Sequence, residues 1–198
     1  FHGQTIFHDP ANKITCQIGD GKLLANTLGI VVINDFRSND VKNGGEGAPL
    51  TPIFHFAVSN SLERPLCILN LGGIANVTWI GSDGRFLAFD TGPANAPIDD
   101  WIYKHRLGMM DKDGTIARSG KVNKNILARL LMDDYFSRDI PKSLDRNYFN
   151  SSLIESLSVP DGAATLTSFS AAAVGLGLRF FPETPCRWLV TGGGRHNS

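Results

Sequence analysis

The sequence predicts an α/β fold in which helices pack against a sheet, and two observations support this prediction. First, three short apolar segments separated by glycine-containing turns indicate an antiparallel meander; they run from Leu66 to Asn70, from Asn76 to Ile80 and from Arg85 to Phe89. Second, helical patterns follow them, and then one more strand from Trp188 to Thr191. Strands, a run of helices and a final strand are typical of a layered α/β fold.

The first third of the chain predicts a strand, a helix and a second strand before a long loop. Residues Ile14 to Ile18 alternate in polarity, and Leu23 to Leu28 form a short helical run that ends at Gly29. The continuous β-branched run from Ile30 to Ile33 predicts a buried strand. The stretch that follows, NDFRSNDVKNGGEGAPLTP, is polar and glycine-rich, so we expect a long loop of the kind found at functional or disordered segments.

Three helices are expected between the meander and the last strand. Pro97 suits the first turn of a helix that continues through Trp101 and Ile102. A second helix places apolar residues on one face between Val122 and Leu131. The third runs from about Asp161 to Phe181, with an apolar stripe formed by Leu166, Phe169, Ala173, Leu176 and Phe180.

The composition favours a globular protein that acts on small molecules. The chain has 198 residues, 42% of them hydrophobic, and its 19 basic and 19 acidic side chains cancel. This balance argues against a nucleic-acid or anionic-membrane partner. No apolar run approaches the ~20 residues of a membrane span, and three separated cysteines give no disulfide framework, so we expect a cytoplasmic protein. Because Phe1 starts the chain without methionine, we expect a piece of a longer protein.

Three segments share a strand that ends in glycine, and they are candidates for a nucleotide site. They are ILNLGGIAN, FDTGPAN and WLVTGGGRHN, each closed by an asparagine: Asn76, Asn95 and Asn197. At strand ends, glycine lets backbone N–H groups approach a phosphate or a flat ring. The alternative is a purely structural turn. The G-x-G-x-x-G and Walker motifs are absent, so a nucleotide would bind by another scheme.

Single residues offer further chemistry, each with a structural alternative. Asp90 ends an apolar strand before a rigid Gly-Pro, which suits a general base or a carboxylate that caps its own turn. His2 and Arg37 offer a neutral hydrogen-bonding group and a cation for a carboxylate or phosphate; a core histidine and a surface ion pair are the alternatives. The segment Asp111 to Gly114, DKDG, lacks the later ligands of a calcium loop and is interpreted as a turn.

Several blocks together resemble one known family. They are HGQTIFHDP, CQIGD, NDFRSND with GGEGAPLTP, LNLGGIANVT, FDTGPANAPIDDW, DKDGTIARSGKVN, PKS and TGGGRHN. In this order they are similar to the 1,6-anhydro-N-acetylmuramic acid kinase family of bacterial cell-wall recycling. The resemblance covers nearly the whole chain but only about half of the family's length.

The resemblance implies a fold and a reaction. The fold would be the actin-like ATPase (ribonuclease H-like) architecture of two α/β domains, present here only in part. Residues 1–65 would be the C-terminal part of the first domain and residues 66–198 most of the second, with the N-terminal phosphate loop and a C-terminal segment missing. Water would open the anhydro ring in an ATP-dependent reaction, and the 6-oxygen would take the γ-phosphoryl to give N-acetylmuramic acid 6-phosphate. The isolated piece is expected to be inactive.

The resemblance also assigns roles to residues. Asp90 would be the catalytic base, and the sugar would contact His2, Gly3, Arg37, Gly92 and Asn95. The nucleotide would contact Asn70, Gly72, Gly73 and Asn76 in one turn and Gly192, Gly193, Gly194 and Asn197 in another. ATP and Mg²⁺ are implied as cofactors, no residue is assigned as a metal ligand, and a homodimer is compatible with the family.

Three positions depart from the family pattern, at Ala94, at Glu46 and after the PKS block. The family has glycine where Ala94 stands, so we expect a left-handed backbone there, strained in alanine by ~1 kcal/mol. These departures leave open two alternatives to the kinase. One is a non-catalytic relative that binds a sugar or nucleotide, and the other is a kinase of the same fold for another sugar.

Overall fold

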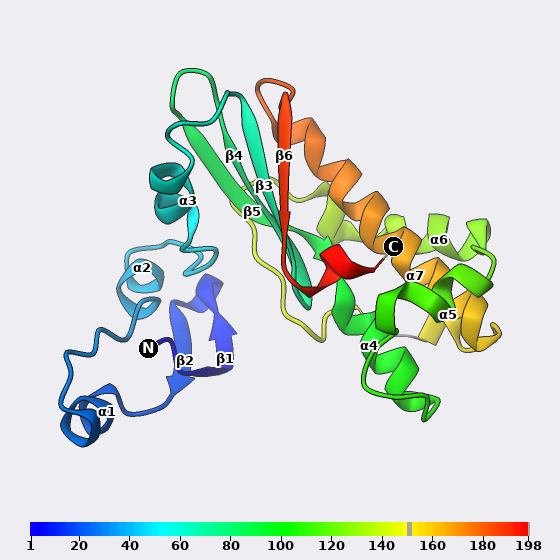
Figure 1. The fold of residues 1–198 in the computed structure, drawn as a ribbon, viewed down its shortest axis with the longest axis horizontal. Coiled ribbons are helices and arrows are strands. Elements are labelled where there is room, and N and C mark those ends of the chain that lie inside the picture. The colour runs from blue at the N-terminus through cyan, green and yellow to red at the C-terminus, as the bar shows by residue number, and fades with distance from the viewer. Residues whose placement is uncertain (150–151, 198) are drawn as a thin grey trace. The chain divides into compact units, whose positions relative to one another are not determined.

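The computed structural model describes residues 1–149 and 152–197 (Figure 1). The chain divides into two compact units, residues 1–53 (unit 1) and residues 54–198 (unit 2). Both units contain strands and helices, which confirms the predicted mixed α/β class. The assignment of residues 1–65 and 66–198 to two larger domains stays a prediction.

Unit 2 is built on a four-stranded sheet in the order β5-β4-β3-β6. Its strands are β3 (Leu66–Leu71), β4 (Ile74–Ile80), β5 (Phe86–Pro93) and β6 (Arg187–Thr191). The first three form the predicted antiparallel meander, and β6 joins β3 in parallel, so all four predicted strands are confirmed. Asp83 fixes the turn between β4 and β5, because its Oδ1 accepts a hydrogen bond of 3.0 Å from the Arg85 N–H.

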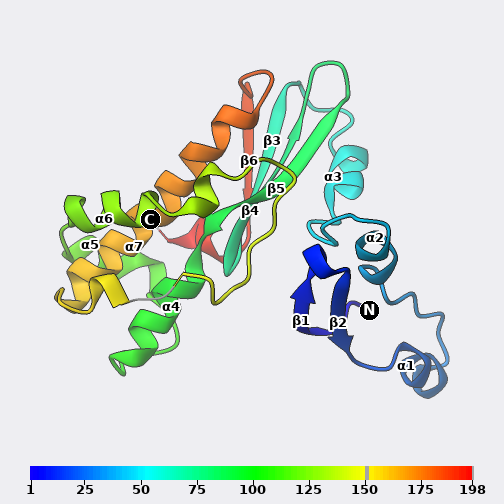
Figure 2. The same ribbon diagram turned by 180° about the vertical axis from the view of Figure 1, so that it is seen from behind.

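Four helices follow the meander, and the long helix α7 lies along the sheet (Figures 1 and 2). They are α4 (Asn95–Lys104), α5 (Thr115–Ser119), α6 (Lys124–Leu131) and α7 (Val159–Gly177). The three predicted helices are confirmed, whereas α5 is an addition. Ser158 begins α7, because its hydroxyl accepts from the Asp161 N–H, and Pro160 suits the first turn. Short 3-10 helices span Lys112–Gly114, Asp134–Ser137, Ser152–Ile154, Leu178–Phe180 and Gly193–His196.

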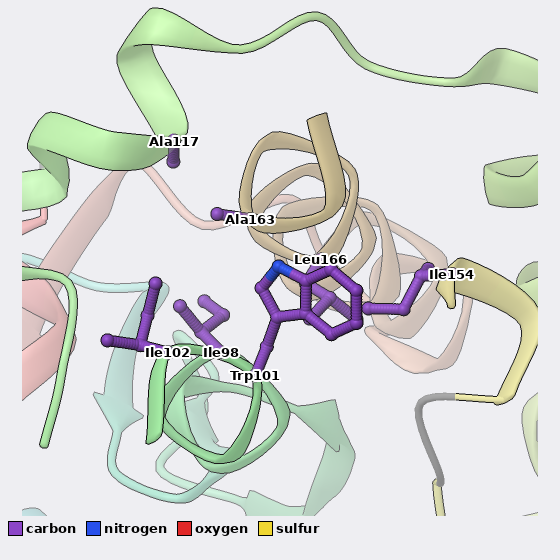
Figure 3. Packing of buried hydrophobic residues seen from close by; sticks show 7 residues of the cluster. All are labelled: Ile98, Trp101, Ile102, Ala117, Ile154, Ala163 and Leu166. Atoms are coloured by element: carbon purple, nitrogen blue, oxygen red, sulfur yellow. The ribbon is translucent and has the colours of Figure 1, made fainter. Parts of the chain in front are cut away.

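The core of unit 2 surrounds α7. Trp101 of α4 packs in one cluster with Ile98 and Ile102 of the same helix, with Leu166 of α7 and with Ile154 (Figure 3). The Trp101 indole is buried, and its Nε1 donates to the Val159 carbonyl at 3.0 Å, so its polar atom is satisfied at the start of α7. The two helices approach closely because α7 has glycine at the contact: a Cβ on Gly162 would lie 2.6 Å from the Trp101 ring.

Unit 1 contains a hairpin and short helices. The hairpin pairs β1 (Gln4–Asp9) with β2 (Ile14–Ile18) around the 3-10 helix Pro10–Asn12. Then come α1 (Gly21–Leu28) and α2 (Ser38–Lys42), and α3 (Pro52–Val58) crosses the boundary of the two units. The predicted β2 strand and α1 helix are confirmed, whereas β1 and α3 were not predicted.

Two predictions for unit 1 are wrong. The run Ile30 to Ile33 is not a strand, and Val31 is 92% exposed. Among the described residues of unit 1, β1 and β2 pair only with each other, so this run joins no sheet, and its Ile33 carbonyl accepts a 2.7 Å hydrogen bond from the amino group of Phe1. The expected loop from residue 34 to residue 52 contains the helix α2, whose Asp40 carboxylate binds the Gly47 N–H at 2.7 Å.

One helical stretch of the described residues, Val159–Phe180, is long and apolar enough to cross a membrane by length and composition. The expectation that no segment reaches that length is therefore wrong for this helix. Of its apolar window, 44% is buried inside the protein, and Leu166, Phe169 and Ala173 of the predicted stripe are in the core. The absence of a membrane partner stays a prediction.

Two glycines of α7 give a matched pair of substitutions. Gly162→Ala is expected to lower the free energy of unfolding by about 1 to 3 kcal/mol, because the new methyl overlaps the Trp101 ring. Gly175→Ala should raise it by about 0.5 to 1 kcal/mol, since nothing lies within 4 Å and alanine favours helix. Urea unfolding followed by circular dichroism measures both. Equal effects of the two substitutions would contradict the close contact of α7 with α4.

Candidate active site

Three glycine-containing turns of unit 2 meet at one end of the sheet. The β3–β4 turn holds Gly72 and Gly73, the end of β5 reaches Ala94 and Asn95, and Gly192 to Gly194 follow β6. The strand register explains the meeting, because Asn70 of β3 pairs with Thr191 of β6, and Ile74 of β4 pairs with Pro93 of β5. The structure therefore brings together the three segments that the sequence marked as candidates.

Asn95 links these turns. Its side-chain Nδ2 donates to the Leu71 carbonyl at 2.9 Å and to the Gly72 carbonyl at 2.8 Å, and its backbone N–H donates to the same Gly72 carbonyl at 2.9 Å. A Cβ on Gly194 would lie 3.1 Å from the Asn95 Oδ1. One amide side chain thus binds the first turn and lies beside the third, which gives Asn95 a structural role; its predicted sugar contact stays a prediction.

The turn after β6 depends on glycine. Gly192 has φ 83°, and a Cβ there would lie 2.5 Å from the Leu71 carbonyl oxygen and 2.7 Å from the Asn70 Oδ1. Only glycine allows this turn to lie against the end of β3. Asn197 ends the short helix Gly193–His196 with a 3.0 Å hydrogen bond from its N–H to the Gly194 carbonyl. Seven of the predicted nucleotide residues gather here: Asn70, Gly72, Gly73, Gly192, Gly193, Gly194 and Asn197.

Asn76, the eighth predicted nucleotide residue, lies on β4 directly opposite Asp90 of β5. The pairing shifts register at this point, because Ala75 pairs with Gly92 and the intervening Thr91 is extra. The Thr91 hydroxyl donates to the Ala75 carbonyl at 3.2 Å. Such a β-bulge changes the direction of the side chains beside it and is common next to active sites.

Asp90 is buried and is held by a distant part of the chain. Its Oδ2 accepts a 2.9 Å hydrogen bond from the Leu144 N–H, and its own N–H donates to the Lys142 carbonyl at 3.1 Å. The Tyr135 hydroxyl donates to the Asp90 carbonyl at 2.6 Å. The side chain is 7% exposed. These bonds join two segments of unit 2 that are far apart in sequence, so they go beyond the capping of Asp90's own turn.

Asp111 is a second buried carboxylate of unit 2, and its surroundings differ. One oxygen accepts from the Ile116 N–H and the other from the Ala117 N–H, each at 2.8 Å, at the start of α5. Both oxygens are therefore engaged with a neighbouring helix. The interpretation of DKDG as a turn is confirmed, since Lys112–Gly114 forms one turn of 3-10 helix.

The backbone at Ala94 does not have the expected left-handed conformation. Its φ is −127°, and its methyl group is buried in the core. The Ala94 N–H donates to the Gly73 carbonyl at 3.0 Å, and its carbonyl accepts from the Ser170 hydroxyl at 3.0 Å. The predicted strain of alanine at a positive φ is wrong. Gly92 is the residue that requires glycine, because a Cβ there would lie 2.6 Å from the Ala173 Cβ of α7.

In unit 1, two predicted sugar-binding residues lie together. The Arg37 Nε donates to the His2 Nε2 at 2.9 Å. Because Nε2 accepts, neutral His2 carries its proton on Nδ1, which lies 2.9 Å from the Gly3 carbonyl. His2 is exposed, so the interpretation as a core histidine is wrong. Gly3 has φ 74°, and a Cβ there would lie 2.6 Å from the Ile18 carbonyl oxygen of β2.

Sequence reasoning missed the residues that hold Asp90. Tyr135 is fully buried and Lys142 is 6% exposed. Burial lowers the pKa of Lys142 to about 8, the nearby Arg179 and Arg138 guanidinium groups also lower it, and Asp139 opposes them. The lysine of the PKS block contributed to the resemblance, but nothing in its local pattern indicates burial.

Magnesium has no ready protein cage here. Among residues 1–149 and 152–197, no three His, Cys, Asp or Glu side chains gather closely enough to hold a metal ion. Mg²⁺ in kinases is usually bound by one or two carboxylates together with phosphates and water. The described residues thus hold no cluster of three such ligands, and a Mg²⁺ ion that is bound together with phosphates does not require one.

Comparison with known proteins places the chain in one family. The family model for anhydro-N-acetylmuramic acid kinase matches residues 1–198. Proteins of that name are similar to the whole chain: one from Paramagnetospirillum magneticum is 54% identical, with 56% of its length covered. One from Rhodospirillum rubrum is 53% identical with 53% covered, and one from Acidiphilium cryptum is 50% identical with 56% covered. The chain thus spans about half the length of these relatives.

Asn95→Ala tests the link between the turns. It removes two hydrogen bonds to the Leu71 and Gly72 carbonyls, so we expect the free energy of unfolding to fall by about 2 kcal/mol. Asn43→Ala is the matched control, because Asn43 makes its 2.7 Å hydrogen bond to the Asn39 carbonyl in an exposed position. In the control, the free energy of unfolding measured by urea titration should change by less than about 0.5 kcal/mol. Similar losses in both variants would contradict the proposed link.

Ala94→Gly tests the backbone at the family's glycine position. Since the methyl group of Ala94 is buried, its removal should lower the free energy of unfolding by about 1 kcal/mol. Thermal unfolding of the two proteins measures the difference. A more stable glycine variant would show that alanine is strained here.

Proposed function

The chain belongs to the anhydro-N-acetylmuramic acid kinase family, and we propose that the whole protein phosphorylates 1,6-anhydro-N-acetylmuramic acid with ATP in peptidoglycan recycling. The observation that carries this proposal is the match of the family over the entire chain, which includes a buried carboxylate at a strand end. Since the chain spans about half of its relatives, the activity is proposed for the complete protein.

The proposed reaction opens a ring and transfers a phosphoryl group. Asp90 takes a proton from water, and the water oxygen forms a bond to the anomeric carbon of the sugar. The bond from that carbon to the 6-oxygen breaks, and the 6-oxygen attacks the γ-phosphorus of ATP. The bond from the γ-phosphorus to ADP breaks, and the products are N-acetylmuramic acid 6-phosphate and ADP. General-base catalysis of this kind typically raises the reaction rate by about 10²- to 10⁴-fold.

The geometry of Asp90 supports its proposed role. The Leu144 N–H holds one carboxylate oxygen at 2.9 Å, and the bulge at Thr91 sets the direction in which the side chain leaves the strand. A base must lie in a fixed position to reach the proton that it removes. Burial near the strand end also excludes bulk water from the carboxylate.

The meeting of glycine turns supports the nucleotide part of the proposal. The Gly72–Gly73 turn would bind phosphate through its backbone, and the Gly192 to Gly194 turn would lie against the adenosine. Mg²⁺ is proposed to come with the nucleotide and to offset phosphate charge. In unit 1, the Arg37 guanidinium would bind the carboxylate of the sugar's lactyl group, and His2, which accepts from the Arg37 Nε, would contact the sugar beside it.

The sheet supports a proposal about the whole fold. An antiparallel meander of three strands, joined in parallel by a strand that follows helices, agrees with a ribonuclease H-like domain of the actin-like ATPases. We propose that residues 66–198 are most of such a domain and that residues 1–65 belong to the domain before it. We also propose that the protein acts in the cytoplasm.

Asp90→Asn in the full-length protein tests the base. We expect kcat to fall by about 10²- to 10⁴-fold, because the amide cannot take a proton, while calorimetry still detects sugar binding. Coupled measurement of ADP release and mass detection of the 6-phosphate follow the reaction. Asp83→Asn is the control, since Asp83 forms an exposed pair with Arg85 and should leave turnover unchanged.

The outcomes separate the alternatives. Undiminished turnover in Asp90→Asn would remove Asp90 as the base. Phosphorylation of another amino sugar in place of the anhydro-sugar would indicate a different kinase, and tight binding without product would indicate a non-catalytic relative.

A further inference from the structure

The outer side of β5 near Asp90 is covered by a chain segment in place of a strand. β5 is the first strand in the sheet order β5-β4-β3-β6, so it has a strand neighbour on one side only. The connection that leads from α6 to α7 runs alongside it in both views (Figures 1 and 2). On that side, Asp90 donates its N–H to the Lys142 carbonyl and accepts the Leu144 N–H at Oδ2. Residues 142–144 therefore hold both the backbone and the carboxylate of Asp90.

Three residues close a ring of hydrogen bonds at this place. The Asp90 N–H donates to the Lys142 carbonyl at 3.1 Å. The Lys142 ammonium Nζ donates to the Tyr135 carbonyl at 3.1 Å. The Tyr135 hydroxyl donates to the Asp90 carbonyl at 2.6 Å. Because each residue binds the next, a shift of the segment at residues 142–144 requires at least two of these bonds to change.

Lys142 is buried, which is unusual for a lysine. Its Nζ lies 4.6 Å from the centre of the Tyr135 ring and 5.0 Å from that of Phe180, so aromatic faces and a carbonyl surround the charge. None of the ion pairs found among the described residues includes Lys142. Burying an ammonium group without a carboxylate partner is costly. Methionine would fill similar space without the cost of burying a charge. What lysine adds at position 142 is a hydrogen-bond donor and a positive charge.

The charged neighbours of Lys142 come from two directions. Arg138 precedes it on the same connection, and its guanidinium lies 5.5 Å from the centre of the Tyr135 ring. Arg179, in the 3-10 helix after α7, lies over the Phe180 ring at 4.6 Å and donates to the Phe136 carbonyl. Asp139 is the acidic neighbour. Burial and the two arginines lower the pKa of Lys142, and Asp139 raises it less, so Lys142 loses its proton within the pH range of an ordinary enzyme assay.

We propose that Lys142 and Tyr135 are positioning residues for Asp90: they fix the segment at residues 142–144 against β5, and this segment holds the carboxylate in the orientation that catalysis requires. This rests on the proposed function, in which Asp90 is the base. Neither residue reaches the substrate in this scheme; both act through Asp90. The consequence is a kcat that depends on the protonation of Lys142, because the neutral amine is a weaker donor and is less attracted to the aromatic faces.

Three substitutions in the full-length protein test the proposal. Lys142→Met keeps the length of the side chain without donor or charge, Tyr135→Phe removes one hydroxyl, and Lys142→Arg keeps a permanent charge. We expect the first two to lower kcat by about 10- to 100-fold through a displaced Asp90, with the KM values for sugar and ATP changed less than about twofold. Lys104→Met is the control, since Lys104 forms an exposed pair with Glu155 and should leave kcat unchanged.

The pH profile separates positioning from simple stability. In the wild-type protein, kcat should decline as the pH rises through about 8, where Lys142 loses its proton. In Lys142→Arg the decline should be absent, because the guanidinium keeps its proton at that pH. Thermal midpoints measured beside each profile show how far stability has changed.

The outcomes for the two proposals are distinct. Wild-type kcat and pH profile in both Lys142→Met and Tyr135→Phe, beside an inactive Asp90→Asn, would overturn the positioning role alone. Full turnover in Asp90→Asn would overturn the proposed base, whatever the other variants do. Lower kcat in Lys142→Met and Tyr135→Phe at unchanged KM, with the high-pH decline lost in Lys142→Arg, would support the positioning role.

Discussion

The close approach of α7 to the sheet is the constraint on which unit 2 depends. At Gly92 the helix leaves no room for a side chain, because a Cβ would lie 2.6 Å from that of Ala173, and at Gly162 the same distance separates it from the Trp101 ring. Small residues on both surfaces therefore set the position of α7 over β5 and α4. Since Asp90 stands on β5 two residues before Gly92, the packing that fixes the strand also fixes the site.

The strand register then determines where the turns meet. Parallel pairing of β3 with β6 brings the ends of both strands to the same side, and the β3–β4 turn returns the chain next to the end of β5. Asn95 stabilises this meeting with hydrogen bonds to the Leu71 and Gly72 carbonyls. Turns separated by more than a hundred residues thus meet at one end of the sheet.

Local pattern predicted much of unit 2 and little of what holds Asp90. The meander, α4, α6, α7 and β6 follow from periodicity and turn residues, which depend on neighbours in sequence. The run Ile30 to Ile33 has the composition of a buried strand, but a strand also needs a partner, and composition does not report one. Ala94 is held by hydrogen bonds with Gly73 and Ser170, which lie far from it in sequence, and Lys142 is buried against Tyr135 and Phe180, whose contacts its local pattern does not indicate.

The two buried carboxylates of unit 2 show why surroundings decide the role of an aspartate. Both carboxylate oxygens of Asp111 accept hydrogen bonds from backbone N–H groups at the start of α5, so Asp111 stabilises that end of the helix. Asp90 is held by the backbone of residues 142–144, and those residues are in turn held by Lys142 over the Phe180 ring. Phe180 follows directly on α7, so the end of the helix that fixes β5 also supports the segment on the outer side of that strand. The strand that carries Asp90 thus packs against α7 at Gly92, while the segment on its outer side is supported by Phe180, in the 3-10 helix that follows α7.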